Sequence, residues 1–261
     1  MVGNMKKNIE KNTNIIKSNN LDIFHIIDFH THILSGIDDG SKCVEESINI
    51  LKEQWDQHID IVVATPHFLA SQNTPEAFFL NRKNAADNLL KAISQLDNRP
   101  KIAQGAEIRY FRGISQCDKL DLLKIMGTNL LLIEMPFFPW SKDILKELYD
   151  LYTVREFKVI IAHIERYLTI QKKSIINELF NMDVFIQANA EFFLNWYTRR
   201  KALNMLEKDQ IHLLGSDCHN LNTRPPNIRQ AIDIIYKYFG EYKVKQLYKL
   251  SQDLLINAVL S

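Results

Sequence analysis

The chain alternates short apolar runs with longer segments in which apolar residues recur every three or four positions. Seven runs have the length of buried strands, at residues 26–29, 59–64, 102–106, 130–133, 159–162, 184–188 and 211–215. The helical spacing covers residues 44–57, 75–96, 141–157, 172–181, 198–208 and 226–238, and an amphipathic stretch at 241–260 could close the bottom of a barrel. This alternation predicts an α/β fold with a parallel sheet, and periodicity alone allows a barrel or an open doubly wound sheet.

A potential metal ligand follows each apolar run. These side chains are His30, His32, His67, Glu107, Glu134, His163, Asn189, Asp217 and His219. The carboxyl ends of barrel strands meet at one mouth, so we expect the side chains to converge there. Imidazole and carboxylate ligands suit manganese, zinc or iron better than copper(I), and about nine candidates exceed what one ion requires. The sequence therefore predicts two or three divalent metal ions.

Each signal has a structural alternative when it is taken alone. The spacing of Asp28, His30 and His32 on a strand predicts a three-residue clamp, although paired histidines also occur without metal. Glu134 could form a salt bridge with an arginine such as Arg109 instead of binding an ion. In the loop GIDDG, Asp38 and Asp39 could form a turn and a helix cap, or one aspartate could cap while the other bridges ions.

Several other residues serve as controls or secondary candidates. His25, His58 and His212 lie before or at the start of apolar runs, so we expect them at the opposite end of the barrel as structural or surface residues. Arg166 and Arg224 follow site-bearing strands and could hold phosphoryl oxygens in bidentate fashion, or form surface ion pairs. The aromatic residues of MPFFPW could receive a substrate ring, and a satellite hydrophobic cluster is the favoured alternative.

Composition narrows the classes of protein. With 261 residues and 46% hydrophobic content, one domain is expected over residues 21–261, after a polar N-terminal extension at 1–20. The net charge of +1 gives no global attraction for nucleic acid or an anionic membrane. No apolar stretch approaches the roughly 18 residues of a membrane helix. Three cysteines without a CxxC pair fit a reducing compartment, so we expect a cytoplasmic protein.

Five segments together resemble one metalloenzyme family, and these are DFHTHILSGIDDG, ATPHF, GAEIRY, IAHIERY and GSDCHN. The chain resembles the PHP family, named for polymerases and histidinol phosphatases. Within it, the likeness is greatest to the bacterial tyrosine-protein phosphatases encoded with capsule and exopolysaccharide genes. The resemblance implies a distorted (β/α)7 TIM-like barrel with a trinuclear site, usually assayed with manganese. It also implies phosphotyrosine hydrolysis on a cognate bacterial tyrosine kinase.

Transferred to this chain, the resemblance assigns residues to roles. The metal positions are His30, His32, Asp39, His67, Glu107, Glu134, His163, Asp217 and His219, and the phosphate positions are Arg166 and Arg224. As a hypothesis for the mechanism, a metal-bridging hydroxide attacks phosphorus in line, and His67 or Asp217 assists proton transfer to the leaving group.

Other readings stay open. The protein could be a histidinol-phosphate phosphatase or another small phosphomonoesterase, an amidohydrolase, or a metal-stabilised binding protein without turnover. A nuclease is disfavoured because binding of a phosphate backbone normally needs a basic track.

Overall fold

The strands form two curled parallel sheets. The computed structural model describes residues 25–96 and 98–255, so the predicted extension at 1–20 lies outside the described residues. One sheet has the order β1 (Ile27–Thr31), β2 (Ile61–Ala64), β4 (Lys101–Gln104). The other has the order β3 (His67–Phe68), β5 (Glu107–Arg109), β6 (Leu130–Glu134), β7 (Lys158–Ile161), β8 (Phe185–Asn189), β9 (Leu213–Gly215). All seven predicted runs contribute a strand, and the predicted α/β parallel fold is confirmed.

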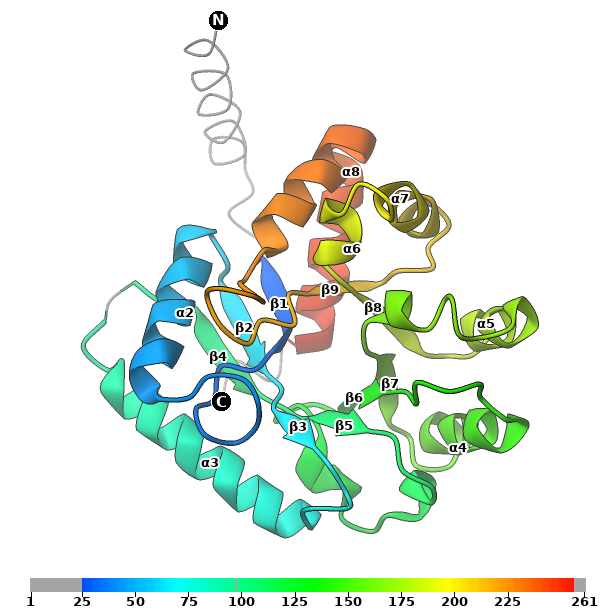
Figure 1. Cartoon of the computed structure of the whole chain (residues 1–261), viewed down its shortest axis with the longest axis horizontal. Helices are drawn as coiled ribbons and strands as arrows, with labels where there is room; N and C mark the ends of the chain where they lie inside the picture. Colours follow the sequence, from blue (N-terminus) through cyan, green and yellow to red (C-terminus); the bar gives the residue numbers. More distant parts are fainter. Residues whose placement is uncertain (1–24, 97, 256–261) are drawn as a thin grey trace, which may run out of the picture.

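At two places the chain breaks off a strand of one sheet and continues as a strand of the other sheet. The chain leaves β2 and resumes as β3 after Pro66, and it leaves β4 and resumes as β5 after Gly105. Across these breaks His67 lies level with Glu107 in the pairing of β3 with β5. At the other side, a parallel bridge joins Thr31 at the end of β1 to Cys218, just beyond β9. The strands therefore curl around one another in chain order (Figure 1).

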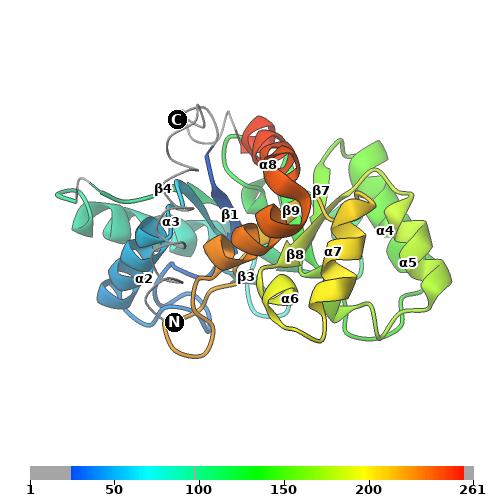
Figure 2. The ribbon, with the colours of Figure 1, turned by 90° about the horizontal axis from the view of Figure 1, so that it is seen from above.

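The helices cover the outside of the strands (Figures 1 and 2). The predicted ones are α2 (Val44–Asp56), α3 (Pro75–Ala92), α4 (Lys142–Thr153), α5 (Lys173–Phe180), α7 (Arg199–Glu207) and α8 (Ile228–Leu255). In α8 two predicted segments join across Gly240, which has a φ of 74° that glycine adopts without strain. The short elements α6 (Glu191–Leu194), η1 (Ile114–Gln116), η2 (Leu120–Leu123) and η3 (Ile164–Arg166) carry too few residues for a periodic signal.

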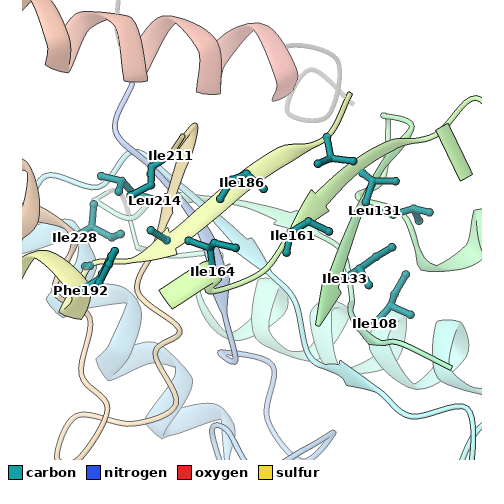
Figure 3. Packing of buried hydrophobic residues seen from close by; sticks show 14 of the residues in the cluster. Ile108, Leu131, Ile133, Ile161, Ile164, Ile186, Phe192, Ile211, Leu214 and Ile228 are labelled. Carbon is teal, nitrogen blue, oxygen red and sulfur yellow. The ribbon is translucent and has the colours of Figure 1, made fainter. Parts of the chain in front are cut away.

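Alternate residues of strands such as β6 and β7 enter two different apolar layers, as the period of two requires. The layer between strands and helices contains residues such as Leu131, Ile133, Ile161 and Ile186 (Figure 3). The inner layer contains their strand neighbours Leu130, Leu132 and Ile160, together with Leu254 and Leu255 of α8. The end of α8 thus packs on the inner layer over its described part, whereas closure of a barrel by this segment stays a prediction.

A buried arginine supports the break between β4 and β5. Arg82 of α3 is only 1% exposed, and its Nη1 and Nη2 donate to the carbonyl oxygens of Gly105 (2.8 Å) and Leu122 (3.0 Å). We expect Arg82→Leu to lower the free energy of unfolding by about 3 kcal/mol, because both carbonyls lose a charged donor. Urea unfolding measures this, with Lys83→Leu on the exposed side as the control. A loss no larger than the control's contradicts this role.

A second prediction concerns acid stability. The Nδ1 atom of His212 accepts a hydrogen bond from the Ile186 backbone N–H (2.9 Å), and burial lowers the pKa of His212 from its ordinary value of 6.5. The unfolded chain therefore takes up a proton more readily, so this contribution is complete above pH 6.5 and is lost as the pH falls through the folded-state pKa. We expect His212→Gln to flatten the loss of melting temperature below neutral pH. His25→Gln, at an exposed site, is the control, and identical pH profiles for both variants contradict the prediction.

Candidate metal centre

Strand ends from both sheets meet around the Glu107 carboxylate. Its Oε2 atom lies 3.1 Å from His30 Nε2, 3.3 Å from His32 Nε2 and 2.9 Å from His67 Nδ1. Asp217, which follows β9, places Oδ1 at 3.6 Å from His30 Nε2 and 3.4 Å from His32 Nε2. The predicted convergence of these side chains is therefore present in the structure. His67 and Glu107 are the first residues of β3 and β5, and so lie just beyond the carboxyl ends of β2 and β4.

The ligand atoms fall into three overlapping groups. Within each group, the atoms all lie within 4.8 Å of one another. The groups are His32, Asp39, His67 and His219, then His30, His32, Glu107 and Asp217, then His67, Glu107 and Glu134. His32, His67 and Glu107 each belong to two groups, so neighbouring sites would share ligands. Eight of the nine predicted metal positions belong to these groups.

Buried polar atoms in the centre show that these residues fit metal ions. Glu107 Oε2, Asp217 Oδ1, His67 Nδ1 and His219 Nε2 are buried and lack a hydrogen-bond partner. A buried polar group without a partner is costly, and more so when it is charged. Ligand atoms that share an ion at about 2.1 Å lie roughly 3 Å apart, which matches the separations around Glu107 Oε2. Divalent cations would satisfy all four atoms.

His163 lies on the other oxygen of Glu107, outside the three groups. Its Nε2 atom is 2.8 Å from Glu107 Oε1 and 3.6 Å from Glu134 Oε1. Glu134 also accepts a hydrogen bond from Arg109 Nε (2.7 Å), so the salt bridge considered from the sequence coexists with a position in a ligand group. The Tyr167 hydroxyl lies 3.2 Å from His163 Nδ1 and orients the ring.

The two aspartates of the GIDDG loop have different partners. Asp39 Oδ1 lies 3.3 Å from His219 Nε2 and 3.5 Å from His67 Nε2. Asp38 accepts hydrogen bonds from His32 Nδ1 (2.7 Å) and the His67 backbone N–H (2.8 Å). Burial raises the pKa of Asp38, but the hydrogen bond and charge of His32 outweigh it and bring the pKa below its ordinary value. Asp38 therefore orients His32, a role that sequence reasoning missed.

Two residues expected near the ions act as supports instead. Asp28 Oδ1 accepts from the Ser216 N–H (2.8 Å), which ties β1 to the end of β9, and Asp28 is in none of the three ligand groups. The expectation of a clamp formed with His30 and His32 is wrong for Asp28. Asn189 Nδ2 donates to Asp217 Oδ2 (3.1 Å) and so supports a residue of the ligand groups.

Gln187 is the support that the sequence did not reveal. Its Oε1 atom accepts from the His163 backbone N–H (2.7 Å) and lies 3.3 Å from His30 Nδ1, while its Nε2 atom donates to Asn189 Oδ1 (2.9 Å). Gln187 and Asn189 are two apart on β8, so both point to the inner side. A glutamine inside an otherwise apolar run was the available signal.

Both predicted phosphate-binding arginines reach the centre. The guanidinium groups of Arg166 and Arg224 each contact Asp217 Oδ2. Burial raises the pKa of Asp217, but the neighbouring His30 and His32 hold it well below its ordinary value, so the arginines face a carboxylate. The same arginines line a cavity of about 600 Å³ beside the ligand groups, together with Leu168, Phe192, Tyr197 and Lys201.

An aromatic side chain forms part of the wall near His163. Phe137 is 48% exposed, and its ring stacks on His163 with 6.3 Å between centroids and 17° between planes. Trp140 is buried and packs against Tyr167 with 5.2 Å between centroids. Trp140 is therefore part of a hydrophobic cluster, as the favoured alternative predicted. Phe137, in contrast, exposes its ring beside His163 of the metal centre.

The sequence controls behave as expected among the described residues. His25, His58 and His212 are in none of the ligand groups found there.

Burial raises the pKa of the Cys218 thiol, which disfavours its thiolate as a ligand or nucleophile. No helix within the described ranges is long and apolar enough to span a membrane.

Comparison with known proteins agrees with this geometry. The sequence profile described as "Capsular polysaccharide synthesis, CpsB/CapC" matches residues 26–257. The chain belongs to the CpsB/CapC family. A relative named tyrosine-protein phosphatase CpsB, from Streptococcus pneumoniae, is 32% identical over 237 residues, which cover 85% of this chain and 95% of the relative. The tyrosine-protein phosphatase YwqE of Bacillus subtilis is 29% identical, with 90% and 93% covered.

Solved structures support the same family. One chain from the crystal structures of YwqE and CpsB, described as unique metal-dependent tyrosine phosphatases, superposes with a TM-score of 0.78 at 27% identity. The match covers 89% of this chain and 95% of that one. A dihydropyrimidinase from Brevibacillus agri gives a TM-score of 0.53 at 8% identity, covering 91% and 73%, and shares the fold alone.

Proposed function

We propose that this CpsB/CapC family member is a metal-dependent protein-tyrosine phosphatase. Its substrate is phosphotyrosine on a bacterial tyrosine kinase, and its role is to regulate capsule or exopolysaccharide synthesis. The observation that carries the proposal is the unpartnered Glu107 Oε2 atom surrounded by three imidazoles, beside a cavity that contains two arginines. A cation site next to fixed guanidinium groups is suited to phosphate esters.

The proposed ligands are the nine positions named from the sequence. They are His30, His32, Asp39, His67, Glu107, Glu134, His163, Asp217 and His219. Their number and the three overlapping groups support two or three divalent ions, with manganese as the best candidate and iron or zinc as alternatives. When bound, such ions supply a nucleophile from water and neutralise phosphoryl oxygens.

The chain's own residues would bind the substrate and transfer the proton. Arg166 and Arg224 both contact one oxygen of Asp217, so their remaining N–H groups can bind phosphoryl oxygens in the cavity. The Asp217 carboxylate orients the two guanidinium groups. Of the two candidates for proton transfer to the leaving group, His67 and Asp217, we assign the step to His67, which is only partly buried, because its neighbours hold Asp217 as a carboxylate.

We also infer that the two curled sheets make one distorted (β/α)7 barrel, of the TIM-like PHP type, in a single domain over residues 21–261. Counting β2 with β3 and β4 with β5 as interrupted strands gives seven strands in chain order. The Thr31–Cys218 bridge, which links the first strand to the last, supports closure. A cytoplasmic location remains a prediction from the sequence.

The choice of substrate tests the proposed function. Protein loaded with manganese is given a phosphotyrosine peptide, histidinol phosphate or a phosphodiester, and released phosphate or alcohol is measured. We expect kcat/KM to be highest for the peptide. A preference for histidinol phosphate would identify a small-molecule phosphomonoesterase instead, and no turnover with any ester at full metal loading would indicate a binding protein.

A further inference from the structure

Two adjacent aromatic side chains stand exposed beside the proposed catalytic cavity. Trp196 is 70% exposed and Tyr197 is 75% exposed, and their ring centroids lie 3.5 Å apart. They follow α6, on the loop after β8, and therefore lie on the same side of the strands as the metal centre. We call this pair the aromatic ridge. Two large exposed rings side by side are unusual on a soluble surface without a binding role.

The aromatic ridge separates the catalytic cavity from a second hollow. Tyr197 lines the cavity that contains Arg166 and Arg224. Trp196 lines the neighbouring hollow, whose other walls come from α7 and α8 and include Arg200 and Tyr238. A chain bound in the cavity and continuing over Tyr197 and Trp196 would enter this hollow.

Hydrogen bonds hold the ridge in place without using the rings. Asn195 Oδ1 accepts from the Tyr197 N–H (3.0 Å), and Thr198 Oγ1 donates to the Phe192 carbonyl (2.9 Å). Arg199 donates to the carbonyls of Phe193 (2.9 Å) and Leu194 (2.7 Å), which fixes the end of α6 to the start of α7. The ring faces are thus preorganised for a ligand.

The charge in the hollow indicates which ligand it fits. Arg199 and Arg200 line it with one carboxylate, Glu207, whereas the whole chain is almost neutral at +1. Arg200 is exposed and is not tied to the α6 carbonyls as Arg199 is. A ligand that reaches the hollow from the cavity would therefore bind more tightly if it placed a negatively charged group there.

We propose that the aromatic ridge and Arg200 dock the polypeptide around the phosphotyrosine, and that they select a segment with an acidic residue on the side that enters the hollow. The proposal rests on the proposed phosphatase function and adds a protein-recognition subsite to it. Trp196 and Tyr197 contact the peptide chain, while Arg200 pairs with the acidic side chain. These residues act on substrate selection, and the ester is cleaved in the cavity beside them.

The test compares substrates that differ only outside the phosphotyrosine. The manganese-loaded full chain is assayed with free phosphotyrosine, a phosphotyrosine peptide flanked by glutamates and the same peptide flanked by glutamines. For Trp196→Ala, we expect the ratio of kcat/KM for the acidic peptide to that for free phosphotyrosine to fall about tenfold, as for loss of one aromatic contact. For Arg200→Glu, we expect kcat/KM to fall about threefold to fivefold for the acidic peptide only. The loss should be smaller at high salt.

Matched variants separate recognition from general damage. Tyr242→Ala removes another exposed aromatic, 74% accessible on α8, and Lys52→Glu reverses an exposed charge on α2. Both should keep the wild-type ratios. Unchanged ratios in Trp196→Ala and Arg200→Glu overturn the proposal, and so does an equal loss for free phosphotyrosine and peptide.

A binding measurement keeps docking distinct from catalysis. Calorimetry gives the Kd of the acidic peptide carrying a non-hydrolysable phosphonomethyl group, for the wild type and Trp196→Ala. We expect the variant to bind about tenfold more weakly. If the wild type cleaves no ester but this difference remains, the phosphatase proposal fails and docking stands. Equal Kd values overturn docking even if the wild type is an active phosphatase.

Discussion

Replacing Glu107 with glutamine is expected to lower kcat/KM for a phosphotyrosine peptide by about a thousandfold or more, and to lower the amount of bound metal. Glu107 is fully buried between His30, His32 and His67, and it belongs to two of the three ligand groups. A neutral amide of the same shape removes the charge that balances the cations. Its NH₂ group, if it replaces Oε2, would also meet imidazole nitrogens that need to bind metal.

The Glu107 result is checked by elemental analysis and phosphate release on the same sample. Glu178→Gln, at an exposed position on α5, is the matched control and should retain both metal and activity. Circular dichroism establishes that the Glu107 variant is folded. A folded Glu107→Gln protein with wild-type activity and wild-type metal content would exclude Glu107 from the centre of the site.

Replacing Arg224 with methionine is expected to lower kcat/KM by about a hundredfold and to leave the bound metal unchanged. Arg224 lines the cavity and contacts Asp217 Oδ2 but offers no ligand atom. Methionine keeps much of the side-chain volume while it removes the donors for phosphoryl oxygens. Because Arg166 contacts the same Asp217 oxygen, it preserves part of the positive charge, and the double variant should lose more activity than either single one.

Arg229→Met is the control for this experiment. Arg229 pairs with Asp233 one turn further along α8, outside the cavity lining. Loss of metal in Arg224→Met would show that the arginine acts by holding Asp217 in place. If Arg224→Met keeps the wild-type kcat/KM, Arg224 does not bind the phosphate.

The strands and most of the ligands were predictable because each apolar run ends at a polar residue of restricted chemistry. The runs at 130–133 and 159–162 became the cores of β6 and β7, with Glu134 and His163 at their carboxyl ends. The parallel arrangement then brings such ends together without further information. Sequence position along a strand was therefore sufficient to place these side chains.

The interruptions between the sheets were not predictable in the same way. β3 and β5 have two and three residues, which is too short for an alternating pattern. Their positions depend on tertiary contacts, such as the hydrogen bond from buried Arg82 to the Gly105 carbonyl. A buried arginine in the middle of a helix has no local signal that separates it from an exposed one.

The supporting hydrogen bonds also exceeded what spacing alone reveals. Alternation placed Asp28 on the same side as His30, but it did not show that the Asp28 carboxylate would accept a hydrogen bond from the Ser216 N–H at the end of β9. Likewise, Asn189 followed its strand as a ligand would, yet it bonds to Asp217 and Gln187. Partners so distant in sequence are set by strand register, and a single chain gives no direct record of register.

The most direct test titrates manganese into chelated protein and measures bound metal and phosphate released from a phosphotyrosine peptide in the same samples. The metal-free protein should be inactive. Activity should rise with metal content and level off at about two or three ions per chain, the number expected from the three overlapping ligand groups. Full activity in metal-free protein, or an activity that does not change as the site fills, would contradict a metal-dependent phosphatase centred on Glu107.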